Sequence, residues 1–334
     1  MSRPTIDDVA RLAGVSIATV SRCLHTPDIV AAKTRERVLD AVRSTEYNLN
    51  AAAQSLRSRR ANTVLVVVPD IGNTFFSEIL GGIEREASAA GLTMLIGNSG
   101  RSKTREEVHV RYLLNGRADG ALLLAEPKAR WSDIPVRAEQ LAAPIVTISE
   151  VGSDFGPLTV SIDNAAAAEA AVRHLVSLGH RSIGHVSGPA SNILTAQRLQ
   201  GYRRALAEAG LPHRPEFEFP GSFGLDSGRL AFERFIALAD RPTALFFAND
   251  EMAMGFLSTA SAAGIRVPRD LSIIGFDDIH FAQTCIPALT TIRQPRSEMG
   301  AAGMRLLLSV LAGEAPVPVR LPFELVVRGS TAPP

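Results

Sequence analysis

The sequence predicts an α/β protein in which a small helical N-terminal unit precedes a core of doubly wound parallel sheets. The first 45 residues contain short amphipathic helical segments, whereas from residue 63 short apolar runs alternate with helical stretches. Strands that alternate with helices form parallel sheets with helices on both faces. About ten such strands exceed the usual size of one sheet, so we expect a core of two lobes.

The N-terminal segment of residues 5–22 predicts two helices joined by a tight turn. Thr5 can cap the first helix, and Asp8 three residues later favours its positive end. Gly14 permits the positive φ that a sharp reversal requires. Ser16 can cap the second helix. The pattern is typical of a helix-turn-helix.

The second of these helices has two unlike faces. Val20, Cys23 and Leu24 fall on the side that packs inward. The opposite face carries small residues, a hydroxyl and a cation, namely Ile17, Ala18, Ser21, Arg22 and His25. Such a face suits a DNA major groove better than a protein core. The alternative is an ordinary helical hairpin at the start of an enzyme.

The charge distribution agrees with a nucleic-acid partner. The formal net charge of the 334 residues is only +1, but residues 1–61 hold 10 Lys and Arg against 6 Asp and Glu. A basic end on a near-neutral body fits contact with phosphates. Cys23 and Cys285 imply no disulfide framework. We find no signal segment and no run of membrane-spanning length, so we expect a cytoplasmic protein.

A third N-terminal helix is expected over Lys33–Ser44, with a weak start because Ala31 and Ala32 offer no capping oxygen. The expected strands of the core are Val64–Pro69, Thr93–Gly97, Ala121–Leu124, Ile145–Ile148, Ile183–Ser187, Ala244–Phe247 and Ser272–Phe276. The expected helices between them include Phe75–Ala90, Ala165–Leu178, Thr195–Ala209 and Glu251–Ala263.

Ligands of parallel sheets bind beyond the carboxyl ends of the strands. Polar and aromatic residues follow four of the expected strands, namely Asp70, Asn73, Phe75, Phe76, Ser149, Glu150, Asn249, Asp250 and Asp277. Asp277 and Asp278 are adjacent at a strand end, where neighbouring side chains point in different directions. A shared acid–base role for these two carboxylates is therefore not expected.

The chain resembles the lactose-repressor family of transcription regulators. The resemblance rests on TIDDVARLAGVSIATVSRCL and, in the same order as in the family, on VVVPD with FFSEI, GHRSIG, RLQGY, NDEMAMG, VPRDLSIIGFDD and LTTIRQP. It implies a helix-turn-helix headpiece and a two-lobed core that is like periplasmic binding proteins. Within the family, PDIGNTFFSEI and LSIIGFDDI are most similar to a repressor that responds to a nucleoside.

The resemblance also implies domain boundaries. Residues 1–49 would form the headpiece, residues 50–61 a hinge helix and linker, and residues 62–334 the core. The N-lobe would comprise about 62–162 and 292–321, and the C-lobe about 163–291 and 322–334. The chain would cross between the lobes near Ile162, Thr291 and Leu321.

The resemblance assigns roles in DNA binding. Arg22 matches an arginine that reads guanine, while Ile17 and Ala18 occupy specificity positions where only apolar contact is possible. Leu56 matches a leucine that wedges between base pairs in the minor groove; a flexible linker with an incidental leucine is the alternative. The candidate DNA-binding residues are Thr5, Ser16, Ile17, Ala18, Thr19, Ser21, Arg22, Asn50, Ala53, Leu56 and Arg57.

The resemblance likewise assigns a small-molecule effector site. Asp277, Arg198 and Asn249 match residues that bind sugar hydroxyls in relatives, through paired hydrogen bonds. Phe75, Phe76 and Phe223 match positions that stack on nucleobases, which favours a nucleoside over a plain sugar, although Phe75 or Phe76 alone could be a core residue. The candidate effector-binding residues are Asp70, Asn73, Phe75, Phe76, Glu150, Arg198, Phe223, Asn249, Asp277 and Gln294.

We therefore expect a repressor that binds a pseudopalindromic double-stranded operator as a homodimer and responds to a nucleoside or, alternatively, a sugar. The dimer would form through Phe75–Ala90 and Glu251–Ala263, and the protein would work at the nucleoid, away from membranes. No cofactor and no metal are expected, because the seven His lack metal-ligand spacing and no Walker or dinucleotide loop occurs. A solute-binding protein for transport would need an export signal. A sugar- or nucleoside-processing enzyme would need a catalytic set.

Overall fold

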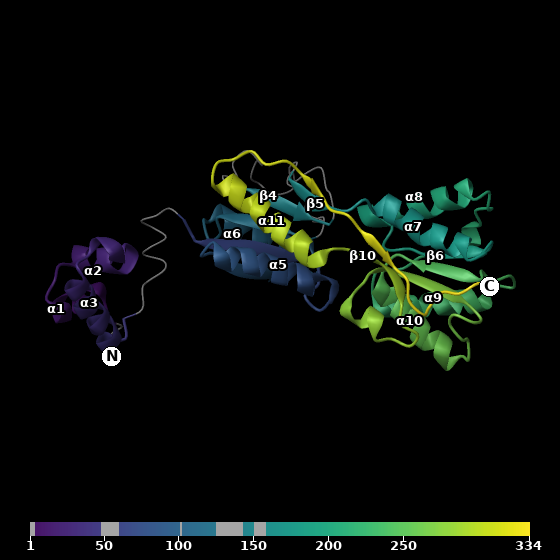
Figure 1. The fold of residues 1–334 in the computed structure, drawn as a ribbon, viewed down its shortest axis with the longest axis horizontal. Helices are drawn as coiled ribbons and strands as arrows, with labels where there is room; N and C mark the ends of the chain where they lie inside the picture. Colours follow the sequence, from purple (N-terminus) through teal and green to yellow (C-terminus); the bar gives the residue numbers. More distant parts are fainter. Residues whose placement is uncertain (1–3, 48–59, 101, 125–142, 150–157) are drawn as a thin grey trace. The chain divides into compact units, whose positions relative to one another are not determined.

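The computed structural model describes residues 4–47, 60–100, 102–124, 143–149 and 158–334 (Figure 1). The chain divides into two compact units, residues 1–61 and residues 62–334.

In its described residues, 4–47 and 60–61, the N-terminal unit contains three helices. Its helices are α1 (Ile6–Ala13), α2 (Ile17–His25) and α3 (Ala32–Thr45), with a 3₁₀ turn at Pro27–Ile29 before α3. Its small core consists of Val9, Ala10, Ala13, Val20, Cys23, Val38 and Ala41. Of the predicted inward face of α2, Val20 and Cys23 are buried in this core and the half-buried Leu24 packs against it.

Capping fixes the turn between α1 and α2. Thr5 and Asp8 form a reciprocal capping box, and Gly14 ends α1 with a φ of 62°. The guanidinium of Arg37 donates to the backbone oxygens of Ala13 and Gly14, which ties α3 to the turn. Ala31 at the start of α3 makes no side-chain cap, as predicted.

The described part of the second unit contains two six-stranded sheets, and each sheet belongs to one lobe. The N-lobe sheet has the order β11-β5-β4-β3-β1-β2, and the C-lobe sheet the order β12-β10-β9-β8-β6-β7. The strands are β1 (Thr63–Val68), β2 (Thr93–Asn98), β3 (Gly120–Leu123), β4 (Ile145–Ile148), β5 (Thr159–Ser161), β6 (Ile183–Val186), β7 (Glu218–Phe219), β8 (Ala244–Phe247), β9 (Ser272–Asp277), β10 (Thr290–Arg293), β11 (Val319–Arg320) and β12 (Glu324–Val326). Among the described strands only the β10–β12 pair is antiparallel.

Helices cover both faces of each sheet. The core helices are α5 (Phe75–Ala89), α6 (Lys103–Leu114), α7 (Asn164–Ser177), α8 (Ile193–Glu208), α9 (Leu225–Ala237), α10 (Asp250–Ala262) and α11 (Arg296–Leu311). α5 and α11 lie side by side in the N-lobe, while α7 with α8 and α9 with α10 form pairs in the C-lobe (Figure 1). The doubly wound α/β class is therefore confirmed.

The central strands read as continuous apolar runs because both of their faces are buried. In β8, Ala244 and Phe246 pack in one cluster with residues of α7 and α8, whereas Leu245 and Phe247 pack in another with residues of α9 and α10. Strands of two or three residues, such as β5, β7 and β11, are too short to be recognised from hydrophobic periodicity. This explains why the predicted strands omit them.

The chain passes between the lobes three times, after β5, after β10 and after β11. The second passage lies between Arg293 and Arg296, a few residues beyond the expected position near Thr291. The reason is that β10 continues to Arg293 and pairs with β9 along its whole length. Among the described residues, no helix is long and apolar enough to cross a membrane.

Candidate functional site

The exposed face of α2 is the candidate DNA-binding surface of the headpiece. Ser16, Ile17, Ala18 and Arg22 are exposed, and Ile17 retains 44% of its accessible surface despite being apolar. Thr19 and Ser21 are half-buried, and Thr5 is exposed but its hydroxyl serves the cap of α1. Four other candidates, Asn50, Ala53, Leu56 and Arg57, lie outside the described residues.

The side chain of Ser16 explains why α2 begins directly after the turn. Its hydroxyl accepts a hydrogen bond from the backbone N–H of Thr19 at 3.2 Å and lies 2.9 Å from the hydroxyl of Thr19. This cap starts α2 directly after the turn and leaves its first residues facing solvent. An exposed isoleucine, alanine and arginine beside two hydroxyls form a surface that can enter a groove.

In the core, one narrow cavity brings together seven of the ten candidate effector residues. It has a volume of about 50 Å³ and is lined by Asn73, Phe75, Phe76, Leu124, Ser149, Leu194, Arg198, Phe223, Asn249 and Asp277. These residues come from both lobes; they lie at or after the carboxyl ends of β1, β3, β4, β7, β8 and β9 or on α5 and α8. Five of the seven candidates were named for their place after a strand, whereas Arg198 and Phe223 were assigned by the family resemblance.

Asp277 is the charged centre of this cavity. It is 5% exposed, and its Oδ1 accepts a hydrogen bond from Gln294 at 2.7 Å and lies 3.9 Å from Nη1 of Arg198. Burial raises the pKa of Asp277 to about 6, although Arg198 and Gln294 act in the opposite direction. A carboxylate with so few partners can accept hydrogen bonds from a ligand hydroxyl.

Arg198 is held from several sides. Its Nε donates to Asn164 at 3.0 Å, its Nη1 donates to the backbone oxygen of Ala248, and its guanidinium carbon lies 3.7 Å from the ring centre of Phe276. Cation–π contact and hydrogen bonds compensate the burial of this cation. The arrangement fixes the guanidinium next to Asp277.

Three phenylalanines provide the apolar wall. Phe75 and Phe76 are both buried and meet edge to face with ring centres 5.1 Å apart. They belong to the N-lobe core and also line the cavity. The half-buried Phe223 lies so close to Gly188 that a Cβ there would be 2.2 Å from the ring. Gly188 is therefore required for the position of that ring.

Several residues at or next to the narrow cavity have a strained backbone. Ser149, Phe223, Asp277 and Asp278 have φ values of 75°, 68°, 114° and 53°, a region that side chains other than glycine rarely adopt. Three of the four line the cavity. Such outliers cluster at binding sites, where the surrounding structure holds them.

Asp250 stabilises the segment that contains Asp277 and Asp278. Its buried carboxyl group accepts hydrogen bonds from the backbone N–H of Ile279 at 2.9 Å and from the hydroxyl of Thr291 at 2.6 Å. Burial and the nearby charge of Asp277 raise the pKa of Asp250 well above its ordinary value. Asp250 therefore holds the turn that presents Asp277 and does not line the cavity.

Two predicted residues do not line the cavity. Asp70 is exposed and accepts a hydrogen bond from the backbone N–H of Gly72, so it serves its own turn. Gln294 is buried behind Asp277 and contacts the cavity only through that residue. Glu150 lies outside the described residues.

The structure adds Leu124 and Leu194 to the lining, which also includes Ser149, one of the residues expected at a strand end. Leu194 stands four residues before Arg198 on α8, a spacing that places both on one helix face. This spacing from Arg198 is the sequence signal by which Leu194 could have been identified. Among the described residues, no group of three or more His, Cys, Asp or Glu could hold a metal ion.

Comparison with known proteins identifies the family. Residues 5–50 match the family described as bacterial regulatory proteins, lacI family, and residues 172–331 match a periplasmic binding protein-like domain. The HTH-type transcriptional repressor CytR of Escherichia coli (strain K12) is 40% identical over 329 residues, which cover 98% of this chain and 96% of CytR. The chain belongs to the LacI family.

Two solved structures of LacI-family proteins are similar to this chain. The lac repressor dimer bound to operator and the anti-inducer ONPF has a TM-score of 0.89 at 29% identity, covering 99% of this chain and 100% of that one. A LacI-family regulator from Enterococcus faecium with bound ribose has a TM-score of 0.74 at 30% identity, covering 81% and 99%. This LacI-family protein is thus a DNA-binding transcriptional repressor with a ligand-binding core, and not an enzyme.

Proposed function

We propose that this LacI-family repressor binds a pseudopalindromic operator as a homodimer and that a nucleoside, bound between its lobes, sets the operator affinity. The observation that carries the proposal is the narrow cavity, which Phe75, Phe76 and Phe223 line together with Asp277 and Arg198. A repressor of this class works where the chromosome is, in the cytoplasm at the nucleoid.

The chemistry of the cavity fits the two halves of a nucleoside. Phenylalanine rings stack on a base without regard to its hydrogen-bonding pattern. A carboxylate and a guanidinium 3.9 Å apart can accept from and donate to neighbouring ribose hydroxyls. The similarity of PDIGNTFFSEI and LSIIGFDDI to a nucleoside-responsive repressor supports the same choice.

The size of the cavity implies movement. A volume of about 50 Å³ is well below the roughly 300 Å³ at which small-molecule sites begin, so a nucleoside requires the two walls to move apart. Because the walls belong to different lobes, binding is linked to the lobe arrangement. The effector can change operator affinity only by binding one arrangement more tightly than the other.

A plain sugar is the second candidate effector. The Enterococcus faecium relative is described with bound ribose, and Phe75 and Phe76 belong to the N-lobe core as well as to the cavity wall. A pentose would use Asp277, Arg198 and Asn249 and leave the rings as packing residues.

For the DNA-bound dimer, we propose that α2 reads the major groove and that α5 and α10 form the subunit interface. Beside α5, β2 exposes Leu95 and Ile96 to 39% and 38%, which an interface would cover. The lac repressor relative is described as a dimer on its operator. We propose that residues 50–61 act as the hinge and that Leu56 is the minor-groove wedge.

The wedge assignment has a direct test. Leu56→Ala removes the side chain that would separate base pairs, so operator affinity measured by fluorescence anisotropy is expected to fall by at least about tenfold. Effector affinity of the same variant stays unchanged because the substitution lies outside the core. Operator affinity equal to that of the wild type contradicts the wedge.

A thermal-shift screen of the full chain tests the effector class. Ligands that bind the folded state raise the melting temperature. Nucleosides, bases, pentoses, hexoses and sugar acids are compared at equal concentration. A shift with nucleosides and none with free sugars supports the proposal. A shift with sugars alone overturns it in favour of the second candidate.

A further inference from the structure

Three successive residues at the end of β9 connect the narrow cavity to the N-lobe. The side chain of Asp277 lines the cavity, and the backbone oxygen of Asp278 accepts a hydrogen bond from Arg296 at the start of α11. The side chain of Ile279 is 2% exposed and packs in the core of the N-lobe. A C-lobe segment that carries a candidate effector residue is thus attached directly to the other lobe.

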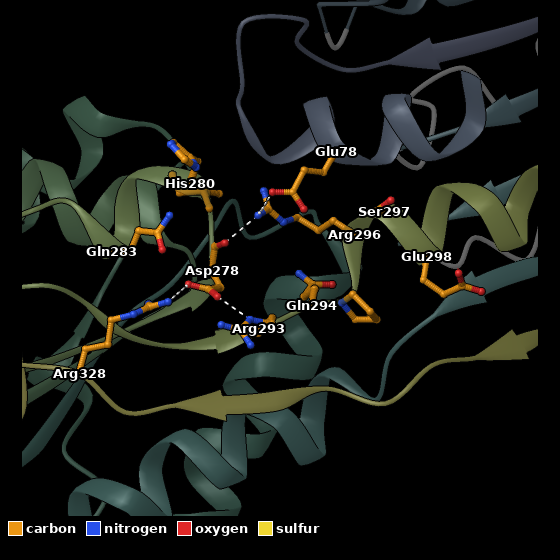
Figure 2. A pocket seen from close by; sticks show the side chains of 12 residues that line it. Glu78, Asp278, His280, Gln283, Arg293, Gln294, Arg296, Ser297, Glu298 and Arg328 are labelled. Atoms are coloured by element: carbon orange, nitrogen blue, oxygen red, sulfur yellow. Dashed lines mark hydrogen bonds and ion pairs between the residues drawn. The ribbon is translucent and has the colours of Figure 1, made fainter. Parts of the chain in front are cut away.

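The guanidinium of Arg296 joins the two lobes through a single nitrogen. Its Nη2 donates to the backbone oxygen of Asp278 in the C-lobe and to Oε1 of Glu78 on α5 in the N-lobe, each at 2.7 Å. Figure 2 shows the guanidinium between these two acceptors. Because Arg296 is only 5% exposed, these charge-assisted hydrogen bonds are shielded from water and are stronger than exposed ones.

The backbone that Arg296 holds is strained. Asp277 and Asp278 have φ values of 114° and 53°, and residues other than glycine keep such conformations only where the surrounding contacts impose them. Asp250 provides one such contact, since it accepts from the backbone N–H of Ile279 at 2.9 Å. The hydrogen bond from Arg296 provides another, directly next to the residue that lines the cavity.

On the N-lobe side, α5 and α11 pack so closely that a shift of one helix moves the other. A Cβ on Gly82 of α5 would lie 2.0 Å from the backbone oxygen of Ser297, and a Cβ on Gly300 of α11 would lie 2.0 Å from the backbone oxygen of Ile79. Close-packed backbones transmit a displacement. Arg296 therefore acts on both helices, of which α5 belongs to the proposed subunit interface.

The connection has space to change. A cavity of about 390 Å³ lies beside it, where the chain passes from β10 to α11, and is lined from both lobes by residues that include Glu78, Asp278 and Arg296. Side chains in a fully packed joint cannot move without distorting it. The space beside Arg296 allows the separation of the lobes to change at this point.

We propose that Arg296 is a positioning residue that transmits effector binding at Asp277 to α5 and α11. The inference rests on the proposed function, because it requires an effector that changes operator affinity. A ligand hydroxyl that bonds to Asp277 shifts the strained segment, and the hydrogen bond from Arg296 passes this shift to the N-lobe. Arg296 thus contributes to the coupling between the two binding events and not to the effector contact itself.

The coupling is measured with the full chain and three probes, uridine, adenosine and ribose. Operator affinity is determined by fluorescence anisotropy with and without each probe at saturation, and the ratio of the two affinities reports the coupling. Arg296→Met replaces the connection by an apolar side chain. It is expected to bring the ratio about fivefold closer to one.

Affinity for the probe separates a positioning role from a structural one. Calorimetric titration without DNA at pH 8, where the carboxylate of Asp277 is ionised, should give a dissociation constant for Arg296→Met within about threefold of the wild type. The variant therefore binds the probe and fails to respond to it. A ratio that stays at the wild-type value overturns the proposal.

Arg305→Met is the matched control. Arg305 lies on the same helix and also connects it to α5, through Glu86 at 3.0 Å, but its two carboxylate partners, Glu86 and Glu298, both belong to the N-lobe. This variant should keep the wild-type ratio. A loss equal to that of Arg296→Met would show that any ion pair of α11 has the same effect, and would overturn the proposal.

Two further measurements do not depend on the folding of Arg296→Met. In the double variant with Glu78→Gln, the carboxylate that would lose its cation is removed as well, and the ratio should fall as in the single variant. In the wild type, the probe should change the amide hydrogen exchange of residues 299–302, at the start of α11, more than that of residues 308–311. Unchanged exchange at residues 299–302 overturns the proposal.

The outcomes distinguish this inference from the proposed function. A wild type whose operator affinity responds to none of the three probes overturns the proposed function, and the role of Arg296 with it. A wild-type response that persists in Arg296→Met overturns only the role of Arg296.

Discussion

Asp277 and Asp278 are neighbours in the chain, and both have left-handed backbone conformations, yet their surroundings are opposite. Asp277 lies among phenylalanines with one amide at 2.7 Å and a guanidinium at 3.9 Å. Asp278 is held by Arg293 and Arg328, each at 2.7 Å. A carboxylate with two close cations serves the fold, whereas a buried carboxylate with few partners is available to a ligand.

Replacing the less paired carboxylate should have the largest effect. In Asp277→Asn the group that would accept two hydroxyl hydrogen bonds loses its charge, so effector affinity is expected to fall about 100-fold. Calorimetric titration with the effector found by the thermal-shift screen measures this change. An affinity within about threefold of the wild type would remove Asp277 from the effector site.

Asp278→Asn should show the reverse pattern. It leaves the guanidiniums of Arg293 and Arg328 without their shared partner, so the free energy of unfolding is expected to fall by about 2 kcal/mol. This figure lies below the range for fully buried pairs because the side chain of Arg293 is 45% exposed. Urea denaturation measures it, and effector affinity should stay within about threefold. A large loss of effector affinity in Asp278→Asn would contradict the assignment of Asp277 to the ligand and of Asp278 to the fold.

The aromatic wall provides a third comparison. Phe223→Ala removes one stacking ring and is expected to weaken a nucleoside about tenfold while leaving ribose binding unchanged. Phe281→Ala is the matched control, since Phe281 is 52% exposed and does not line the narrow cavity. Equal losses for nucleoside and ribose would return Phe223 to a packing role and favour the sugar candidate.

The pH dependence is the smallest expected effect. Because the pKa of Asp277 is raised to about 6, protonation at lower pH competes with hydroxyl binding, and effector affinity should fall about fourfold from pH 7 to pH 5.5. Asp277→Asn should show no such change. An affinity that is flat over this range in the wild type would contradict the raised pKa.

The same raised pKa makes the free energy of unfolding increase as the pH falls, whereas effector affinity decreases. A raised pKa means that the folded protein binds this proton more tightly than the unfolded chain does. The stabilisation is therefore complete below pH 4 and is lost as the pH rises through 6. Comparing urea denaturation of the wild type and Asp277→Asn at pH 5 and pH 7 isolates this contribution.

The headpiece could be derived from sequence almost completely because its determinants are local. Thr5, Gly14 and Ser16 act within one helical turn of their own positions, and the inward residues of α1 and α2 follow helical spacing. The sequence also predicted that Ala31 would provide no side-chain cap.

The sequence did not predict the core strands of two or three residues, because so short a run has no hydrophobic periodicity.

The narrow cavity was partly derivable. The rule that ligands bind at the carboxyl ends of parallel strands names five of the candidates that line it, because strand ends in one sheet share an edge. The resemblance added Arg198 and Phe223. Neither source gives the direction of a side chain, so Asp70 bonds its own backbone and Gln294 stands behind Asp277.

The sequence by itself determined the helix-turn-helix, the alternation of strands and helices and the residues at the strand ends, since each depends on neighbours in the chain. Only the tertiary structure decided that Asp278 is held by Arg293 and Arg328 whereas Asp277 lines the narrow cavity. It also decided that the buried Nε of Arg296 has no hydrogen-bond partner among the described residues. Burial and pairing depend on groups that are distant in sequence, such as Glu78 with Arg296. No local pattern records such contacts.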